Sequence, residues 1–140
     1  LIILIFLQVI MGAFVSGLDA GRIYQTWPLM GESFIPNDLI IKSFQNFIEF
    51  DNHSLVQFYH RNLAYIIILY SIFVTIFILK NKMINLYAPL KYFIFFLLLQ
   101  VVLGIFTLIT GLNILIASIH QITGVLLVLS AINLYYFRVK

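Results

Sequence analysis

Two histidines and one arginine are the residues of this sequence that could do chemistry in apolar surroundings. His60 and Arg61 stand side by side in QFYHRNLAY, which leads straight into a long apolar run, and His120 stands in SIHQITG within another. Burying either kind of side chain without a partner is costly or forces loss of its charge. We therefore predict that each of these side chains has a partner.

The absence of other metal ligands narrows the kind of site. The sequence has no cysteine, which excludes disulfides, iron–sulfur clusters, cysteine-ligated zinc and covalently attached haem. Catalytic zinc usually takes more than two protein ligands, and a proton relay would normally place an acid within an apolar run. Haem iron, by contrast, can be held by one imidazole on each face of the macrocycle. We predict that His60 and His120 are axial haem ligands and that Arg61 binds a propionate.

Each of these residues also has a plainer interpretation. A membrane histidine can simply be a hydrogen-bond partner between helices, and Arg61 can extend towards lipid headgroups. His53 precedes His60 by seven residues, lies outside the apolar run, and is interpreted as a surface histidine. Ligation is favoured because His60 and His120 are expected at the same depth and stand in matching motifs.

The elements that must position these residues are membrane helices. The chain of 140 residues is 63% hydrophobic and 9% charged, whereas soluble domains carry about 25% charged residues. It contains four long apolar runs, at 1–17, 58–79, 92–111 and 114–137. Each reaches or nearly reaches the roughly 20 residues that cross a bilayer as a helix. The prediction is an all-α transmembrane four-helix bundle, one membrane domain over 1–140, with a long extracytoplasmic loop over 18–57.

The charges predict how the bundle is oriented. The segment between the second and third runs contains three lysines and no acid, and the last three residues include Arg138 and Lys140. All five acids lie in the 18–57 loop. By the positive-inside rule, both ends of this chain face the cytoplasm or its equivalent. The net charge of +3 gives no indication of nucleic-acid binding.

A repeat relates the two halves of the chain. LQVIMGAF in the first run matches LQVVLGIF in the third, and each is followed by a helix that starts HRNLA or HQITG. The prediction is a pseudo-twofold repeat of helix pairs that carries one histidine onto the other. Gly12 and Gly104 would let a backbone or a flat ligand approach closely. Gln8 and Gln100 are interpreted as hydrogen-bond partners between helices.

The outer segment is predicted to be ordered. GLDAGRIYQTWPLMGESFIP has the glycines and prolines of a turn-rich loop. An amphipathic helix is expected near 38–50, with Asp38 as its N-cap. Its apolar face would consist of Ile40, Phe44, Phe47 and Ile48. Asp19 is predicted to organise a turn above the haem, the alternative being a solvated acid, and Trp27 is either an interfacial anchor or a wall of the pocket.

These blocks together resemble a known family. GAFVSGLDAGRIYQTWPLMGESFIP, NFIEFDNHSLVQFYHRNLAY, LGIFTL and SIHQITGVLL are similar to the C-terminal half of haem A synthase, over essentially the whole chain. The resemblance implies one half of a membrane oxidoreductase with eight helices in two similar halves. That enzyme oxidises a methyl group of haem O to the formyl group of haem A for cytochrome oxidase. It also implies a non-covalent haem b between His60 and His120.

The resemblance carries further expectations. The haem O substrate and an important glutamate belong to the N-terminal half, and Gln57 stands at the equivalent place here, so this half alone should not be catalytically competent. The chain starts at Leu1 within apolar sequence and is expected to be part of a longer protein. The expected location is a bacterial plasma membrane or the mitochondrial inner membrane. Expected partners are membrane lipid, haem O synthase and cytochrome oxidase assembly factors, with a homo-oligomer left open.

Two alternatives from other functional classes stay open. One is a stand-alone b-type cytochrome that passes electrons without transforming haem. The other is a haem-free membrane scaffold or transporter half whose histidines join helices. A reduced-minus-oxidised spectrum separates the haem-free alternative from the others, and an upstream Glu-x-x-His-Arg motif separates the synthase from the cytochrome.

Overall fold

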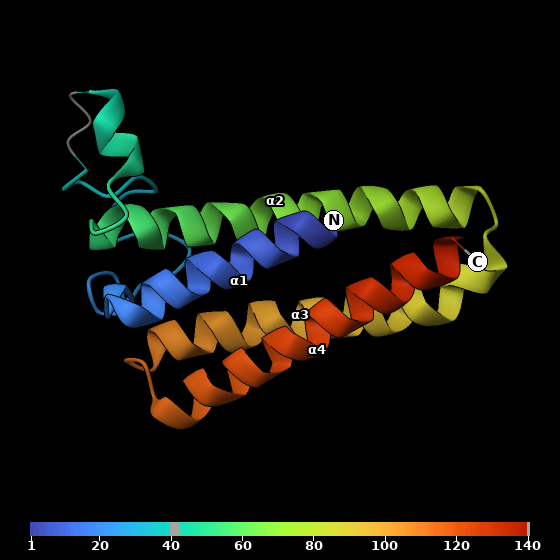
Figure 1. Cartoon of the computed structure of the whole chain (residues 1–140). Coiled ribbons are helices and arrows are strands. Elements are labelled where there is room, and N and C mark those ends of the chain that lie inside the picture. The colour runs from blue at the N-terminus through green and yellow to red at the C-terminus, as the bar shows by residue number, and fades with distance from the viewer. Residues whose placement is uncertain (40–42, 140) are drawn as a thin grey trace.

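A computed structural model describes residues 1–39 and 43–139, and this part of the chain is helical (Figure 1). The long helices are α1 (Ile2–Gly17), α2 (His53–Lys80), α3 (Tyr87–Ile109) and α4 (Ile114–Val139). Three short 3-10 helices, η1 (Ala20–Arg22), η2 (Phe44–Ile48) and η3 (Ile84–Leu86), lie in the connections. Apart from one isolated bridge between Met30 and Ser33, the described residues contain no β-structure. The predicted all-α class is confirmed.

The four helices form a ring in which successive helices run in opposite directions. α1 packs against α2, and α3 packs against α4, while contacts of α1 with α4 and of α2 with α3 close the ring (Figure 1). α2 and α4 therefore occupy diagonal corners and run in the same direction.

Three segments are long and apolar enough to cross a membrane: α2, the stretch Ile84–Ile109, and α4. α1 is apolar but has 16 residues. It is therefore about 24 Å long, against a hydrocarbon core of about 30 Å. Three of the four predicted spans are thus supported by length and composition, and the crossing by α1 stays a prediction.

Two of the helices, α2 and α3, begin earlier than the apolar runs indicated. α2 starts at His53 rather than 58, because the Asn52 side chain accepts a hydrogen bond from the Leu55 N–H at 3.1 Å and caps the helix. α3 starts at Tyr87 rather than 92, with Pro89 in its first turn, where the missing N–H costs nothing. Hydropathy identified the apolar part of α2 and of α3, but not the more polar first turn that extends each helix.

The apolar core fills the part of the bundle remote from the long loop. Its buried members are Ile5, Ile67, Ile78, Leu86, Leu90, Phe93, Leu97, Leu127, Ala131 and Leu134. All four long helices contribute, and Phe93 is completely buried. Along every helix these residues lie further from the loop end than the histidines do. The interior at the loop end is therefore left to other side chains.

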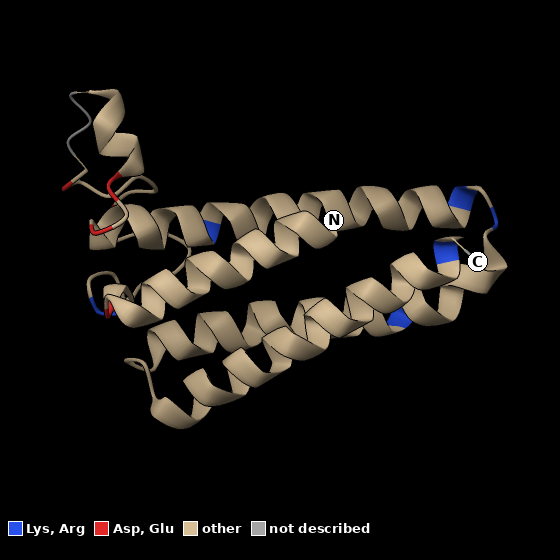
Figure 2. Ribbon diagram, viewed as in Figure 1, with Lys and Arg blue, Asp and Glu red and all other residues tan. Residues whose placement is uncertain are grey.

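Charged residues separate to the two ends of the bundle (Figure 2). All five acids belong to the long loop, whereas Lys80, Lys82, Lys91 and Arg138 gather at the opposite end. Arg22 and Arg61 are the described basic residues at the acidic end. This arrangement is the one the positive-inside rule associates with a cytoplasmic basic end.

The orientation can be tested by cysteine labelling, because the chain has no native cysteine. Glu32 and Asn81 are exposed, one in the long loop and one after α2. In intact cells we expect an impermeant maleimide to label Glu32→Cys but to reach Asn81→Cys only after lysis. Labelling of Asn81→Cys from outside, with Glu32→Cys protected, would contradict the orientation.

Candidate functional site

The structure places both predicted histidine ligands at the loop end of the bundle. His60 lies in α2 and His120 in α4, each about two turns from the start of its helix. Both are partly buried. Each histidine therefore lies near the loop end of one of two diagonal helices.

Gln8 of α1 holds His60 in position. The Gln8 side-chain amide donates to the His60 carbonyl oxygen at 3.0 Å and lies 3.2 Å and 3.3 Å from the two ring nitrogens. One turn further along α1, Gly12 faces the same ring: a Cβ there would stand 3.2 Å from His60 Cε1. The imidazole thus rests against a bare backbone, with a glutamine beside it.

The second helix pair repeats this arrangement. The Gln100 amide of α3 donates to the His120 carbonyl oxygen at 2.8 Å, and also to the Thr123 hydroxyl. A Cβ at Gly104 would stand 3.1 Å from His120 Cε1. Both glutamines make the interhelical hydrogen bonds that the sequence predicted. The close approach predicted at Gly104 is made by the histidine ring itself.

The loop end also contains buried polar atoms without hydrogen-bond partners among the described residues. These atoms are Gln8 Oε1, Gln57 Oε1, Arg61 Nε and His120 Nδ1, with Ser71 Oγ deeper in α2. An unsatisfied buried polar group costs about 1–3 kcal/mol, and native structures contain few of them. Four of these atoms belong to residues at the loop end, so this end of the bundle has unused hydrogen-bonding capacity.

Arg61 is occupied by the long loop. One terminal nitrogen, Nη1, donates to the carbonyl oxygens of Thr26 at 2.9 Å and Leu29 at 3.2 Å, and the other, Nη2, donates to that of Tyr24 at 2.8 Å. Its Nε–H is the buried donor that stays free. The contact with a propionate stays a prediction, and the terminal nitrogens have partners that the sequence did not reveal.

Tyr24 joins the loop to the first turns of α2. The Gln57 amide donates to the Tyr24 carbonyl oxygen at 2.9 Å. The Tyr24 hydroxyl and the Ser54 hydroxyl each donate to the Asp38 carboxylate at 2.5 Å. Ser54, Gln57 and Arg61 follow one face of α2, and this polar spacing is the signal in the sequence that could have indicated a bound loop.

The hydrogen bond between Tyr24 and Asp38 shifts the pKa of both side chains. The hydrogen bond from Tyr24 to Asp38 is the main reason that the pKa of Tyr24 lies above its usual value. Burial acts to raise the pKa of Asp38, but the hydrogen bonds from Ser54 and Tyr24 outweigh it and keep that pKa below its usual value. Asp38 is therefore ionised at neutral pH, as an anchor for two donors.

The helix predicted near 38–50, with Ile40 on its apolar face, includes residues 40–42, which lie outside the described residues, so it stays a prediction. Asp38 itself sits in a turn, and its carboxylate accepts from Tyr24 and Ser54. The described part contains only η2, which Ser43 and Asn46 cap reciprocally. The Tyr59 hydroxyl donates to the Phe47 carbonyl oxygen at 2.9 Å and ties η2 to α2. The polar contacts of Asp38 with Tyr24 and Ser54 compete with the role of helix cap.

The other loop residues singled out from the sequence are exposed. Asp19 has a left-handed backbone (φ 52°) at the start of η1, and its carboxylate lies 3.5 Å from Arg22 Nε. Asp19 thus stands in a turn, but on the solvent side. Trp27 is 47% exposed, and His53 is the exposed first residue of α2.

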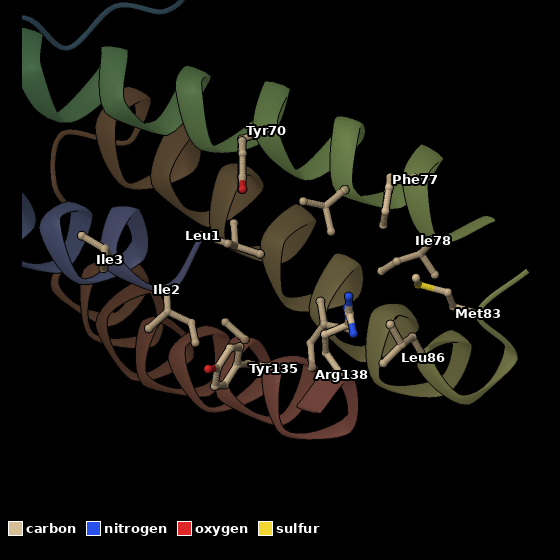
Figure 3. Close-up of a pocket in the computed structure, with 13 residues that line it drawn as sticks. Leu1, Ile2, Ile3, Tyr70, Phe77, Ile78, Met83, Leu86, Tyr135 and Arg138 are labelled. Atoms are coloured by element: carbon tan, nitrogen blue, oxygen red, sulfur yellow. The ribbon is translucent and has the colours of Figure 1, made fainter. Parts of the chain in front are cut away.

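A separate cavity lies at the basic end of the bundle (Figure 3). It has a volume of about 530 Å³ and is lined mainly by apolar side chains of α1, α2 and α4. Tyr70, Tyr135 and Arg138 are its polar members. Neither His60 nor His120 contributes to it, so it is not the predicted haem site.

Comparisons with known proteins identify relatives of this chain. The sequence model of a family described as cytochrome oxidase assembly protein matches residues 1–132. Haem A synthase of Pelagibacter ubique is 41% identical over 138 residues, which is 96% of this chain and 39% of the relative. Haem A synthase of Rickettsia felis is 39% identical over 139 residues, 99% of this chain and 41% of the relative. The chain thus spans about two fifths of the length of these relatives. No solved structure matches it.

Proposed function

Because this chain belongs to the cytochrome oxidase assembly protein family, we propose that it is the haem b-binding part of a haem A synthase. In this proposal it supports oxidation of the haem O methyl group to the formyl group of haem A, and it acts within a bacterial plasma membrane. The observation that carries the proposal is the pair of matched histidine environments on diagonal helices. The relatives named haem A synthase supply the reaction.

The residues present fit a haem held by two imidazoles. His120 Nδ1 and Gln8 Oε1 are buried without partners among the described residues, so the site has unused hydrogen-bonding capacity. Gly12 and Gly104 leave each imidazole room against a helix backbone. Two neutral imidazoles provide the lone pairs that low-spin haem iron takes. No third metal-binding side chain is required for this kind of site.

Each residue has a separate task in the proposed site. His60 and His120 bind the iron, while Gln8 and Gln100 fix the two helices by bonding the histidine carbonyl oxygens. The free Nε–H of Arg61 is the donor that remains for a propionate. A bound haem b would supply one-electron transfer. The chain's residues hold and orient it and, with the apolar core beneath, keep water away.

The oxidation itself is assigned to the part of the enzyme outside this chain. Gln57 stands one turn before His60, and its neutral amide donates to Tyr24. An amide cannot accept a proton as a carboxylate would, so this part has no general base beside the histidine. We therefore propose that it passes electrons to or from a haem O site elsewhere in the protein. A stand-alone b-type cytochrome is the second candidate, favoured by the same Gln57.

A complementation experiment separates these two candidates. The complete coding sequence that contains this chain is expressed in a bacterium deleted for its own haem A synthase, and the extracted haems are analysed by chromatography. We expect haem A from the wild-type sequence, and loss of at least about nine tenths of it in His60→Ala or His120→Ala, as for loss of a metal ligand. Haem b in the protein with no haem A formed would favour the cytochrome. Absence of haem from the wild-type protein would overturn both candidates.

A further inference from the structure

Gln57 and Arg61 bind a part of the long loop that the sequence alone left unplaced. Together they donate four hydrogen bonds to loop carbonyl oxygens: one from Gln57 and one from Arg61 to Tyr24, and one each from Arg61 to Thr26 and Leu29. Hydrogen bonds from a charged donor stabilise more than neutral ones. Two side chains of one helix thus hold a whole turn of the loop.

The loop segment is built to accept these donors. The Thr26 hydroxyl donates to the Leu29 carbonyl oxygen at 2.9 Å and accepts from the Gly31 N–H at 2.9 Å, which closes the turn. Gly31 has φ +75°, a backbone that a side chain would strain. The turn therefore presents three carbonyl oxygens towards one guanidinium. A planar fork with several fixed donors can meet all three, whereas an ammonium is a compact point charge.

Aromatic packing continues the contact on both sides of Arg61. The Phe34 ring lies 6.3 Å from the Phe58 ring, edge to face, and 6.2 Å from the Tyr65 ring, stacked. Phe58 and Tyr65 stand one turn before and one turn after Arg61 on α2. The loop from Tyr24 to Phe34 therefore lies along the face of α2 next to the one that carries His60.

We propose that Gln57 and Arg61 are positioning residues that clamp this loop over the loop end of the bundle. The clamp fixes the helix turn that carries His60 and keeps water from the edge of the haem. This inference rests on the proposed haem site for its effect on haem, but not for the contact between loop and helix. The principal role of Arg61 is then to bind the loop through the two terminal nitrogens of its guanidinium group. The attraction between its positive charge and a haem propionate is a secondary role.

Arg61→Lys and Gln57→Leu test the clamp without depending on haem. Hydrogen–deuterium exchange of the loop amides is measured by mass spectrometry on the protein in lipid nanodiscs. Each variant keeps a side chain of similar bulk but removes the fork or the amide donor. Loss of one such hydrogen bond should raise exchange in 24–33 about tenfold. Arg22→Lys is the matched control, since Arg22 is exposed and contacts Asp19 instead.

The haem midpoint potential separates the two roles of Arg61. Looser loop packing admits water, which stabilises the more highly charged oxidised haem, so we expect a lower potential in both variants. Arg61→Lys keeps the positive charge, and a role of charge alone predicts an unchanged potential and unchanged loop exchange in that variant. Unchanged exchange in both Arg61→Lys and Gln57→Leu overturns the clamp even when haem is bound. If the wild-type protein contains no haem but both variants still raise loop exchange, the proposed haem site alone is overturned and the clamp stands.

Discussion

Replacing His60 or His120 with alanine should remove low-spin haem from the protein. Each variant deletes one of the two imidazoles that we propose as iron ligands. These imidazoles belong to diagonal helices, each about two turns from the start of its helix. Even outer-shell changes cost about 10–100-fold in metal affinity, so loss of a ligand should leave at most about a tenth of the occupancy. The measurement is haem per protein, with the visible spectrum of the purified membrane protein. Any haem that stays should be high-spin.

His53→Ala is the matched control for this experiment. It removes the same kind of side chain from the same helix, but His53 is the exposed first residue of α2. We expect unchanged haem content and an unchanged spectrum in that variant. If the His120→Ala protein kept full occupancy and a low-spin spectrum, His120 would not be a ligand and the assignment would be abandoned.

Filling the space opposite a histidine ring should have the second-largest effect. A Cβ at Gly104 would stand 3.1 Å from His120 Cε1, and one at Gly12 would stand 3.2 Å from His60 Cε1. An alanine at either glycine requires the histidine ring to shift by a few tenths of an ångström. The two methyl groups of a valine would displace the ring further. Overpacking costs about 1–3 kcal/mol, which corresponds to about 5- to 150-fold in affinity. We expect Gly104→Val and Gly12→Val to lose haem about tenfold or more, measured by titration of the apoprotein.

Gly17→Val provides the control for added bulk in a membrane helix. Gly17 ends α1, and no atom lies within 4 Å of the place a Cβ would take. That variant should bind haem as the wild-type protein does. Equal haem affinity for Gly104→Val and Gly17→Val would show that the contact between glycine and histidine does not shape the site.

The interhelical hydrogen bonds of Gln8 and Gln100 could be predicted because they depend on period and spacing. LQVxxGxF places a glutamine and a glycine one turn apart on one face of a helix, and the following helix begins near its histidine. Short connections between antiparallel helices then bring Gln100 and Gly104 against His120. The structure shows the same contacts for Gln8, Gly12 and His60, although a much longer loop separates them.

The loop contacts could not be predicted in the same way. The fork of Arg61 binds carbonyl oxygens, which every residue carries, so no side-chain pattern at Thr26 or Leu29 identifies them as acceptors. Asp38 matched the usual N-cap type, but its carboxylate instead accepts from Tyr24 and Ser54. Contacts over such long separations depend on how the loop folds back, which local propensity does not determine.

Low-temperature electron paramagnetic resonance of the oxidised protein in its membrane tests the central claim most directly. We expect one haem per chain, with the low-spin signal of iron bound by two imidazoles, because His60 and His120 would both bind the iron. The signal should disappear in both alanine variants and persist in His53→Ala. A high-spin signal in the wild-type protein, or no haem signal at all, would contradict the account.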